Sequence, residues 1–125
     1  MWIDCNPNPK GKRVGDCAVR AVALALGIDW DTAYTILSAK GFDWKDMPNA
    51  DGVWGAVLHD NKFTREAIAN TCPDCYTAED FCKDNKKGIY VLGFGGHVAT
   101  VRDGNVCDTW DCSQNVPQFF WRKEK

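Results

Sequence analysis

Three side chains with the types and order needed for covalent catalysis occur in the sequence: Cys17, His97 and Asp108. Cys17 follows Gly15 and Asp16 and begins an Ala/Leu-rich stretch that predicts a central helix. Unpaired backbone N–H groups and the helix dipole at such a position favour the thiolate over the thiol. The helix terminus lowers a thiol pKa by only about one unit, so an activated nucleophile also needs a cationic neighbour.

His97 is the histidine placed to provide that neighbour. It begins a predicted strand, 97–102, directly after Gly95-Gly96, where the missing side chains leave room beside the ring. His59, the other histidine, lies in a polar stretch and is interpreted as a solvated residue at a helix end.

A predicted hairpin would bring an acid to His97. Asp103-Gly104 suits a two-residue turn, which places Ala99 opposite Asp108. His97 and Asp108 then project from one face as diagonal neighbours, as in a Cys, His, Asp triad. A register shifted by one residue would bring Asp111 to His97 instead, so Asp111 remains the alternative acid.

The elements that must position these residues fall into two groups. One helical pattern covers 18–26, with Asp16 as N-cap and Gly27 at the C-terminus, and a second covers 32–40, with Asp31 as N-cap and Gly41 as the residue that ends it. A short third helix runs from 49–51 to Val57, and a fourth begins with a capping box at Thr77. Strand patterns cover 89–94, 97–102, 105–110 and 116–122, after an irregular lead-in over 1–16. We therefore expect one α+β domain, 1–125, with N-terminal helices and a central cysteine-bearing helix packed on a C-terminal antiparallel sheet.

Composition limits the function classes. The 125 residues include 15 basic and 17 acidic side chains, a formal net charge of −2, so nucleic acid and anionic membranes are not expected partners. The longest apolar run, Ala21 to Leu26, is far shorter than the ~20 residues that span a bilayer. An odd count of seven cysteines and the absence of a signal-peptide pattern predict reduced thiols and a cytoplasmic location.

The other cysteines allow a different interpretation. Cys72-Pro73-Asp74-Cys75, with Cys82 further on, could hold part of a zinc site or form a redox pair. A second clear pair is missing, because Cys107 and Cys112 are widely spaced and Cys5 is isolated. We therefore expect structural thiols, with neither metal nor cofactor.

The segments Gly15-Asp16-Cys17-Ala18-Val19-Arg20-Ala21, Gly95-Gly96-His97-Val98-Ala99-Thr100-Val101 and Asp108-Thr109-Trp110 resemble the papain-like superfamily of cysteine peptidases. The chain is most similar to small bacterial and phage members and to peptidases that process bacteriocin leaders. The resemblance implies a papain-like fold and a cytoplasmic, monomeric thiol hydrolase of a bacterial cell or phage, acting on a peptide or protein substrate through an acyl-enzyme. Cys17 would be the nucleophile, His97 the base, Asp108 the residue orienting His97, and Trp110 a shield of the His97 contact from water.

One feature departs from that family. Papain-like enzymes complete the oxyanion hole with a Gln several residues before the cysteine, and this lead-in contains no Gln. Asn8, an amide flanked by Pro7 and Pro9, and Lys12 are the candidate replacements. Losing one such donor typically costs about 10²–10³ in rate. The alternative function is therefore a catalytically weak papain-like binding module, such as a phage protein that engages a host protein.

Overall fold

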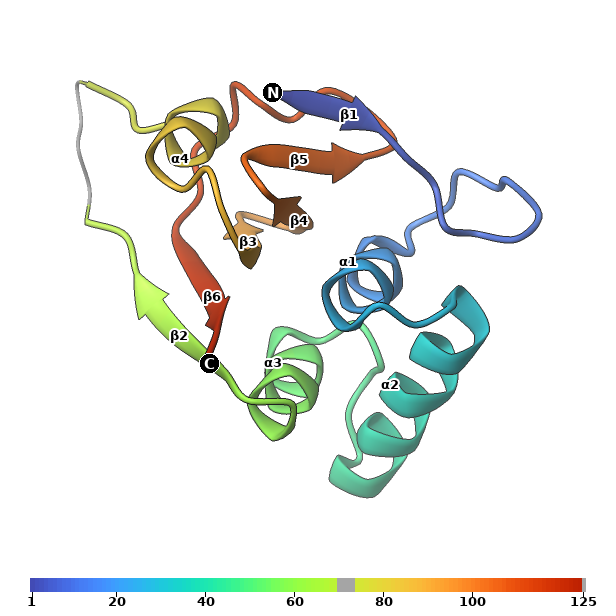
Figure 1. The fold of residues 1–125 in the computed structure, drawn as a ribbon. Helices are drawn as coiled ribbons and strands as arrows, with labels where there is room; N and C mark the ends of the chain where they lie inside the picture. Colours follow the sequence, from blue (N-terminus) through green and yellow to red (C-terminus); the bar gives the residue numbers. More distant parts are fainter. Residues whose placement is uncertain (70–73, 125) are drawn as a thin grey trace.

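The structure, a computed structural model, describes residues 1–69 and 74–124 (Figure 1). Its elements, in chain order, are β1 (Trp2–Asp4), α1 (Cys17–Leu26), α2 (Trp30–Trp44), α3 (Asp51–Asp60), β2 (Phe63–Ala67), α4 (Ala78–Asp84), β3 (Ile89–Phe94), β4 (His97–Arg102), β5 (Asn105–Asp108) and β6 (Phe119–Lys123). Within the described residues, the helices are too short or too polar to cross a membrane. The chain is therefore an α+β protein, as the sequence predicts.

The sheet is mixed, which corrects the expected antiparallel arrangement. Its six strands lie in the order β1-β5-β4-β3-β6-β2. Four of the five pairings are antiparallel, but β1 pairs with β5 in parallel, with Ile3 opposite Cys107. The sequence interpretation missed β1 and β2 because both are edge strands whose mainly exposed residues lack an apolar alternation.

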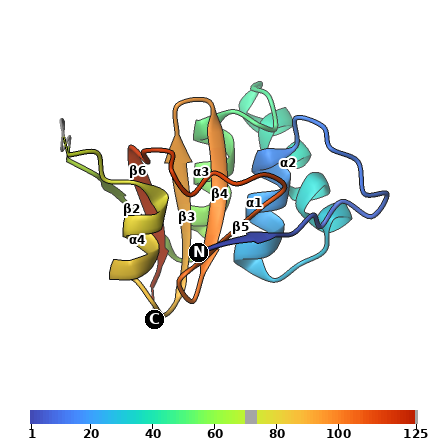
Figure 2. The ribbon, with the colours of Figure 1, turned by 90° about the horizontal axis from the view of Figure 1, so that it is seen from above.

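Two hydrophobic clusters cover the two faces of the sheet. Figure 2 shows α1 and α2 on one side of β3 and β4, and α4 on the other. Alternation along β3 explains this division, since Val91 packs in the cluster of α1 to α3 and Leu92 in the cluster of α4. A strand pattern that is apolar throughout is thus buried on both faces.

Helix α1 lies directly on the sheet because its side chains are small. Six of its ten residues are alanine or valine, and all six are buried. The close approach allows the Thr100 hydroxyl of β4 to donate to the Ala21 carbonyl at 2.7 Å. Gly27 ends the helix in the left-handed conformation, φ 68°, as expected. The N-terminus of α1, and with it Cys17, is therefore fixed against β4.

Helix α2 differs from its predicted limits at both ends. Asp29, rather than Asp31, accepts the capping hydrogen bond, from the Thr32 N–H at 2.8 Å. Gly41 does not stop the helix, which continues to Trp44. Gly41 instead lets the following segment fold back, because a Cβ there would lie 2.8 Å from the Asp46 carbonyl oxygen. Glycine is therefore required at position 41 for the close approach of the backbone, and not to end the helix.

The remaining differences are smaller. Thr77 and Asp80 form the predicted capping box of α4. Strand β5 ends at Asp108 instead of residue 110, and β6 starts at Phe119 instead of residue 116. The chain leaves the sheet at Asp108, which places this residue at the end of its strand beside α1.

Gly93 in β3 leaves room for an aromatic ring, and this supports a stability prediction. A Cβ at Gly93 would lie 2.1 Å from Phe119 Cζ of β6, so Gly93→Ala must displace the ring. We expect a loss of about 2–3 kcal/mol in the free energy of unfolding, measured by urea denaturation. Gly52→Ala is the control, because its Cβ meets nothing within 4 Å. It should be neutral or stabilise by up to about 1 kcal/mol, and equal effects of the two changes would contradict the steric explanation.

Candidate active site

Cys17 is the first residue of α1 and is half-buried. Asp16 does not cap this helix, contrary to expectation. Its carboxylate instead accepts hydrogen bonds from Arg20 Nε at 2.8 Å, Trp30 Nε1 at 2.9 Å and Asn8 Nδ2 at 3.4 Å. The positive end of the helix dipole is thus left without a capping carboxylate, which favours a thiolate at Cys17.

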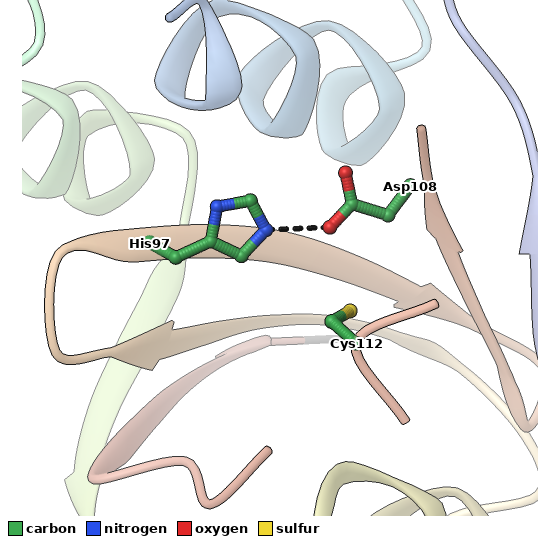
Figure 3. Close-up of side chains that lie close together, drawn as sticks. All are labelled: His97, Asp108 and Cys112. Carbon is green, nitrogen blue, oxygen red and sulfur yellow. Dashed lines mark hydrogen bonds and ion pairs between the residues drawn. The ribbon is translucent and has the colours of Figure 1, made fainter. Parts of the chain in front are cut away.

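His97 starts β4, after the turn in which Gly96 has a φ of 79°. The pairing of β4 with β5 follows the predicted register, with Thr100 opposite Cys107 and Arg102 opposite Asn105. That register confirms the predicted diagonal relation of His97 and Asp108. His97 Nε2 and Asp108 Oδ2 are 2.5 Å apart (Figure 3). This contact leaves Nδ1 of the ring for Cys17, which lines the same cavity as His97 and whose pKa His97 lowers.

Asp108 is only 1% exposed, but its carboxylate is fully hydrogen-bonded. Besides His97 on Oδ2, Oδ1 accepts from Arg20 Nη1 and from the Thr109 N–H, both at 2.7 Å. Burial opposes the charged form, yet the hydrogen bonds from His97 and Arg20 outweigh it and lower the pKa of Asp108. The acid is therefore an ionised group with a fixed orientation.

The electrostatics of Cys17 and His97 favour a charged pair. Burial raises the pKa of Cys17, but the hydrogen bond and charge of His97, with the Val98 N–H, lower it overall. Burial likewise disfavours the imidazolium, but hydrogen bonds, above all that of Asp108, raise the pKa of His97 to about 11. Both shifts favour a thiolate paired with an imidazolium, the ground state of an activated cysteine.

A cavity of about 450 Å³ opens over this pair. Trp110 contributes to its wall, is 42% exposed and has its ring 4.8 Å from that of His97, so it covers one side of the imidazole. The cavity walls are formed by Arg13, Val14, Gly15, Cys17, Arg20, Gly96, His97, Thr109 and Trp110. A substrate carbonyl entering here would meet the Cys17 sulfur.

The other predicted site residues lie elsewhere. Neither Asn8 nor Lys12 lines this cavity, because the Asn8 amide is turned to Asp16 and Lys12 is exposed on the lead-in. The Asp111 carboxylate accepts from Ser113 in a local turn, so Asp108 is the acid at His97. His59 is exposed and lines a different cavity, of about 420 Å³, together with Trp44 and Phe119.

Two residues of the site were missed by sequence reasoning. Arg13 lines the cavity and donates from Nη1 to the Thr109 carbonyl at 2.5 Å, which ties the lead-in to the end of β5. Cys112 is 0% exposed, its Sγ lies within 4.8 Å of ligand atoms of His97 and Asp108, and burial raises its pKa, so it remains a neutral thiol. Neither residue lies in a local motif, and only the tertiary fold brings them to His97 and Thr109.

The donor atoms of His97, Asp108 and Cys112 lie within 4.8 Å of one another, and all three residue types bind metals (Figure 3). The arrangement does not fit a metal centre. The 2.5 Å between His97 and Asp108 is a hydrogen-bond distance, whereas two ligands of one zinc ion lie about 3.3 Å apart. Arg20 also occupies the other carboxylate oxygen, and a raised thiol pKa disfavours the thiolate that a metal needs.

The possible metal site at Cys72, Cys75 and Cys82 cannot be drawn as a whole, because Cys72 lies outside the described residues. Cys75 is exposed, and Cys82 is buried in α4.

Comparison with known proteins found no similar one: the sequence matches no family model and no curated protein, and its fold matches no solved structure. The interpretation of the site accordingly depends on its own geometry.

Proposed function

We propose that the protein is a thiol hydrolase of the papain-like kind, acting on peptide or isopeptide amides through an acyl-enzyme. The observation that supports this most directly is the position of His97, between the Cys17 thiol and the Asp108 carboxylate, at a cavity. A nucleophile, a base and an orienting acid in sequence beside a cavity form the arrangement that acyl transfer by cysteine requires.

The steps follow from these contacts. The Cys17 thiolate attacks the substrate carbonyl carbon, forming a C–S bond, and the negative charge passes to the carbonyl oxygen. When the C–N bond breaks, the His97 imidazolium gives its proton to the leaving amine, and a thioester remains. Water then adds to the thioester while His97 takes its proton, and cleavage of the C–S bond releases the acid and restores the thiolate and imidazolium. Asp108 keeps one ring nitrogen occupied, so the other faces the reaction.

The developing oxyanion needs hydrogen-bond donors. The Cys17 backbone N–H, in the first turn of α1, has no partner within the helix and is one donor. For the side-chain donor we now assign Arg13 in place of Asn8 or Lys12, because Arg13 is the lead-in donor that lines the cavity. Its guanidinium contacts Thr109 through Nη1 and has further N–H groups to offer.

The alternative is a papain-like binding module with a reactive but slow cysteine. The observation that favours it is the missing amide donor, since the lead-in has no Gln and the Asn8 side chain is bound to Asp16. Both functions include a thiolate at Cys17. They differ in whether an acyl group on that sulfur is released.

The fate of an acyl group tests the proposal. We expect p-nitrophenyl acetate to acetylate Cys17 and the acetyl adduct to disappear by hydrolysis, both followed by intact-mass spectrometry and peptide mapping. A stable adduct would favour the binding module, and no adduct at Cys17 would reject both. Cys75→Ser, which removes an exposed thiol, is the control for nonspecific acetylation.

Competitive alkylation measures the activation of the thiol. At pH 6 an ordinary thiol is about 0.3% thiolate, whereas His97 lowers the pKa of Cys17 and so raises its thiolate fraction. We expect limiting iodoacetamide to modify Cys17 about 10–100-fold faster than the exposed Cys75, since a lower pKa also reduces intrinsic nucleophilicity. Isotope-coded reagent and peptide mapping give both rates, and equal rates would contradict an activated Cys17.

A further inference from the structure

Arg20 lies one turn after Cys17 on α1 and joins two carboxylates that come from different parts of the chain. Its Nε donates to Asp16 Oδ1 at 2.8 Å, and its Nη1 donates to Asp108 Oδ1 at 2.7 Å. Arg20 is 6% exposed. A guanidinium so far from water is stable only with such partners, and its planar fork can serve both at once.

Asp16 is itself held from several sides. Trp30 Nε1 and Asn8 Nδ2 donate to Asp16 Oδ2, while Oδ1 receives Arg20. Burial disfavours its charge, but these hydrogen bonds outweigh burial and lower the pKa of Asp16. Arg20 therefore has an anchored, ionised partner on the side away from Asp108.

We propose that Arg20, anchored by Asp16, is a positioning residue that fixes the Asp108 carboxylate with Oδ2 toward His97. Rotation of a carboxylate about its last bond has broad energy wells, so one contact with His97 does not fix its plane. The Arg20 contact on Oδ1, with that of the Thr109 N–H, does. The use of this positioning in amide hydrolysis rests on the function proposed above.

The same unit sets the electrostatic potential at the reactive pair. From Cys17 through His97, Asp108 and Arg20 to Asp16 the charges alternate in sign, and Arg20 lowers the pKa of Cys17. Removing the charge of Asp16 makes the surroundings of the pair more positive. This favours the thiolate over the thiol at Cys17 and the neutral imidazole over the imidazolium at His97, so both pKa values fall. Among residues 1–69 and 74–124, the other charged and titratable groups at the pair are Arg13 from the lead-in, Asp108 from β5 and Cys112 from the segment after β5, all unchanged in the variants below.

Asp16→Asn is the first test. We expect the pKa of Cys17 and that of His97 to fall together, each by about 0.5–1 unit. The acid limb of iodoacetamide alkylation gives the first value. NMR of histidines labelled at Cε1 gives the second, with the His97 signal assigned by comparison with His59→Gln. A change that merely loosened the fold would move the two pKa values toward their ordinary values, in opposite directions.

Arg20→Met and Arg20→Lys complete the test. Arg20→Met should shift the acid limb of Cys17 alkylation to higher pH by about one unit, and Arg20→Lys should restore most of that shift. Because lysine cannot hold both carboxylates, the fixed plane of Asp108 is not restored, and acylation by p-nitrophenyl acetate should stay about tenfold slow. Arg122→Met, at an exposed ion pair with Glu66, removes the same charge and should leave the limb unmoved.

The outcomes separate the two proposals. An unchanged alkylation limb and unchanged histidine titration in folded Asp16→Asn would overturn the positioning role, as would native acylation in Arg20→Lys. Circular dichroism establishes that each variant is folded, and Asp16→Asn keeps the size and one acceptor of the native side chain. These measurements need no amide turnover, so failure to find a hydrolysed substrate would reject only the proposed function.

Discussion

Cys17→Ala should reduce hydrolysis of internally quenched peptides to the uncatalysed background, a loss of about 10⁴-fold or more. In the proposed mechanism the thiolate sulfur is the atom that forms the acyl-enzyme, and no other described cysteine lines the cavity at His97. Cys112 cannot replace it, because this thiol is fully buried and its pKa is raised. The measurement is the rate of fluorescence release by a peptide library at pH 7.

The matched control is Cys75→Ala, which removes an exposed cysteine distant in sequence from Cys17, His97 and Asp108. It should hydrolyse the library at the native rate. Native turnover by Cys17→Ala would reject the proposed nucleophile. If neither the native protein nor Cys75→Ala hydrolyses the library, and the acetyl adduct on Cys17 persists, the binding module is favoured.

Asp108→Asn should slow acylation of Cys17 by about 10²–10⁴-fold at pH 6 to 7. Burial lowers the pKa of His97, but hydrogen bonds, above all that of the Asp108 carboxylate, raise it to about 11. Without it, the imidazole titrates near its ordinary value of about 6.5 and a cation no longer stabilises the thiolate. Alkylation of Cys17 should therefore become slow at pH 6 and recover as pH rises through the ordinary thiol range, whereas the native rate stays high in acid.

Asp111→Asn is the control for that change, because Asp111 is the alternative acid of the sequence interpretation. Its carboxylate is in a local turn with Ser113, so the variant should keep the native pH profile. A loss of activation in Asp111→Asn and not in Asp108→Asn would reverse the assignment. Folding of Asp108→Asn needs a separate check, since the change leaves buried Arg20 with one carboxylate and costs about 3–5 kcal/mol if unrelieved.

The candidate catalytic residues were predictable where local geometry determines their positions. A two-residue turn at Asp103-Gly104 fixes the register of β4 and β5, and the register alone places His97 diagonal to Asp108. Cys17 could be placed because an apolar helix begins immediately after Gly15 and Asp16. In these cases a few consecutive residues contain the whole physical cause.

The rest of the site depends on partners that are distant in the sequence. An aspartate immediately before a helix predicts an N-cap. The Asp16 carboxylate instead accepts from the guanidinium of Arg20 and the indole of Trp30, in place of the N–H groups of the first helical turn. Asn8 resembles an oxyanion donor by type, yet its amide turns to Asp16. Arg13 enters the cavity wall only because Thr109 lies across from the lead-in. Chain-distant ion pairs and hydrogen bonds of this kind leave no local pattern.

The parallel pairing of β1 with β5 also bears on when the site can form. Residues 2–4 pair with residues 106–108, and the Cys5 N–H donates to the Asp108 carbonyl, so β5 is completed by the first part of the chain. Contacts so far apart in sequence form slowly and only after the intervening chain exists. During synthesis from the N-terminus, Cys17 emerges early, but the residues that activate it emerge near the end. Under the proposed function, a nascent chain therefore has an ordinary thiol at Cys17, and activation of this thiol occurs only in the folded protein.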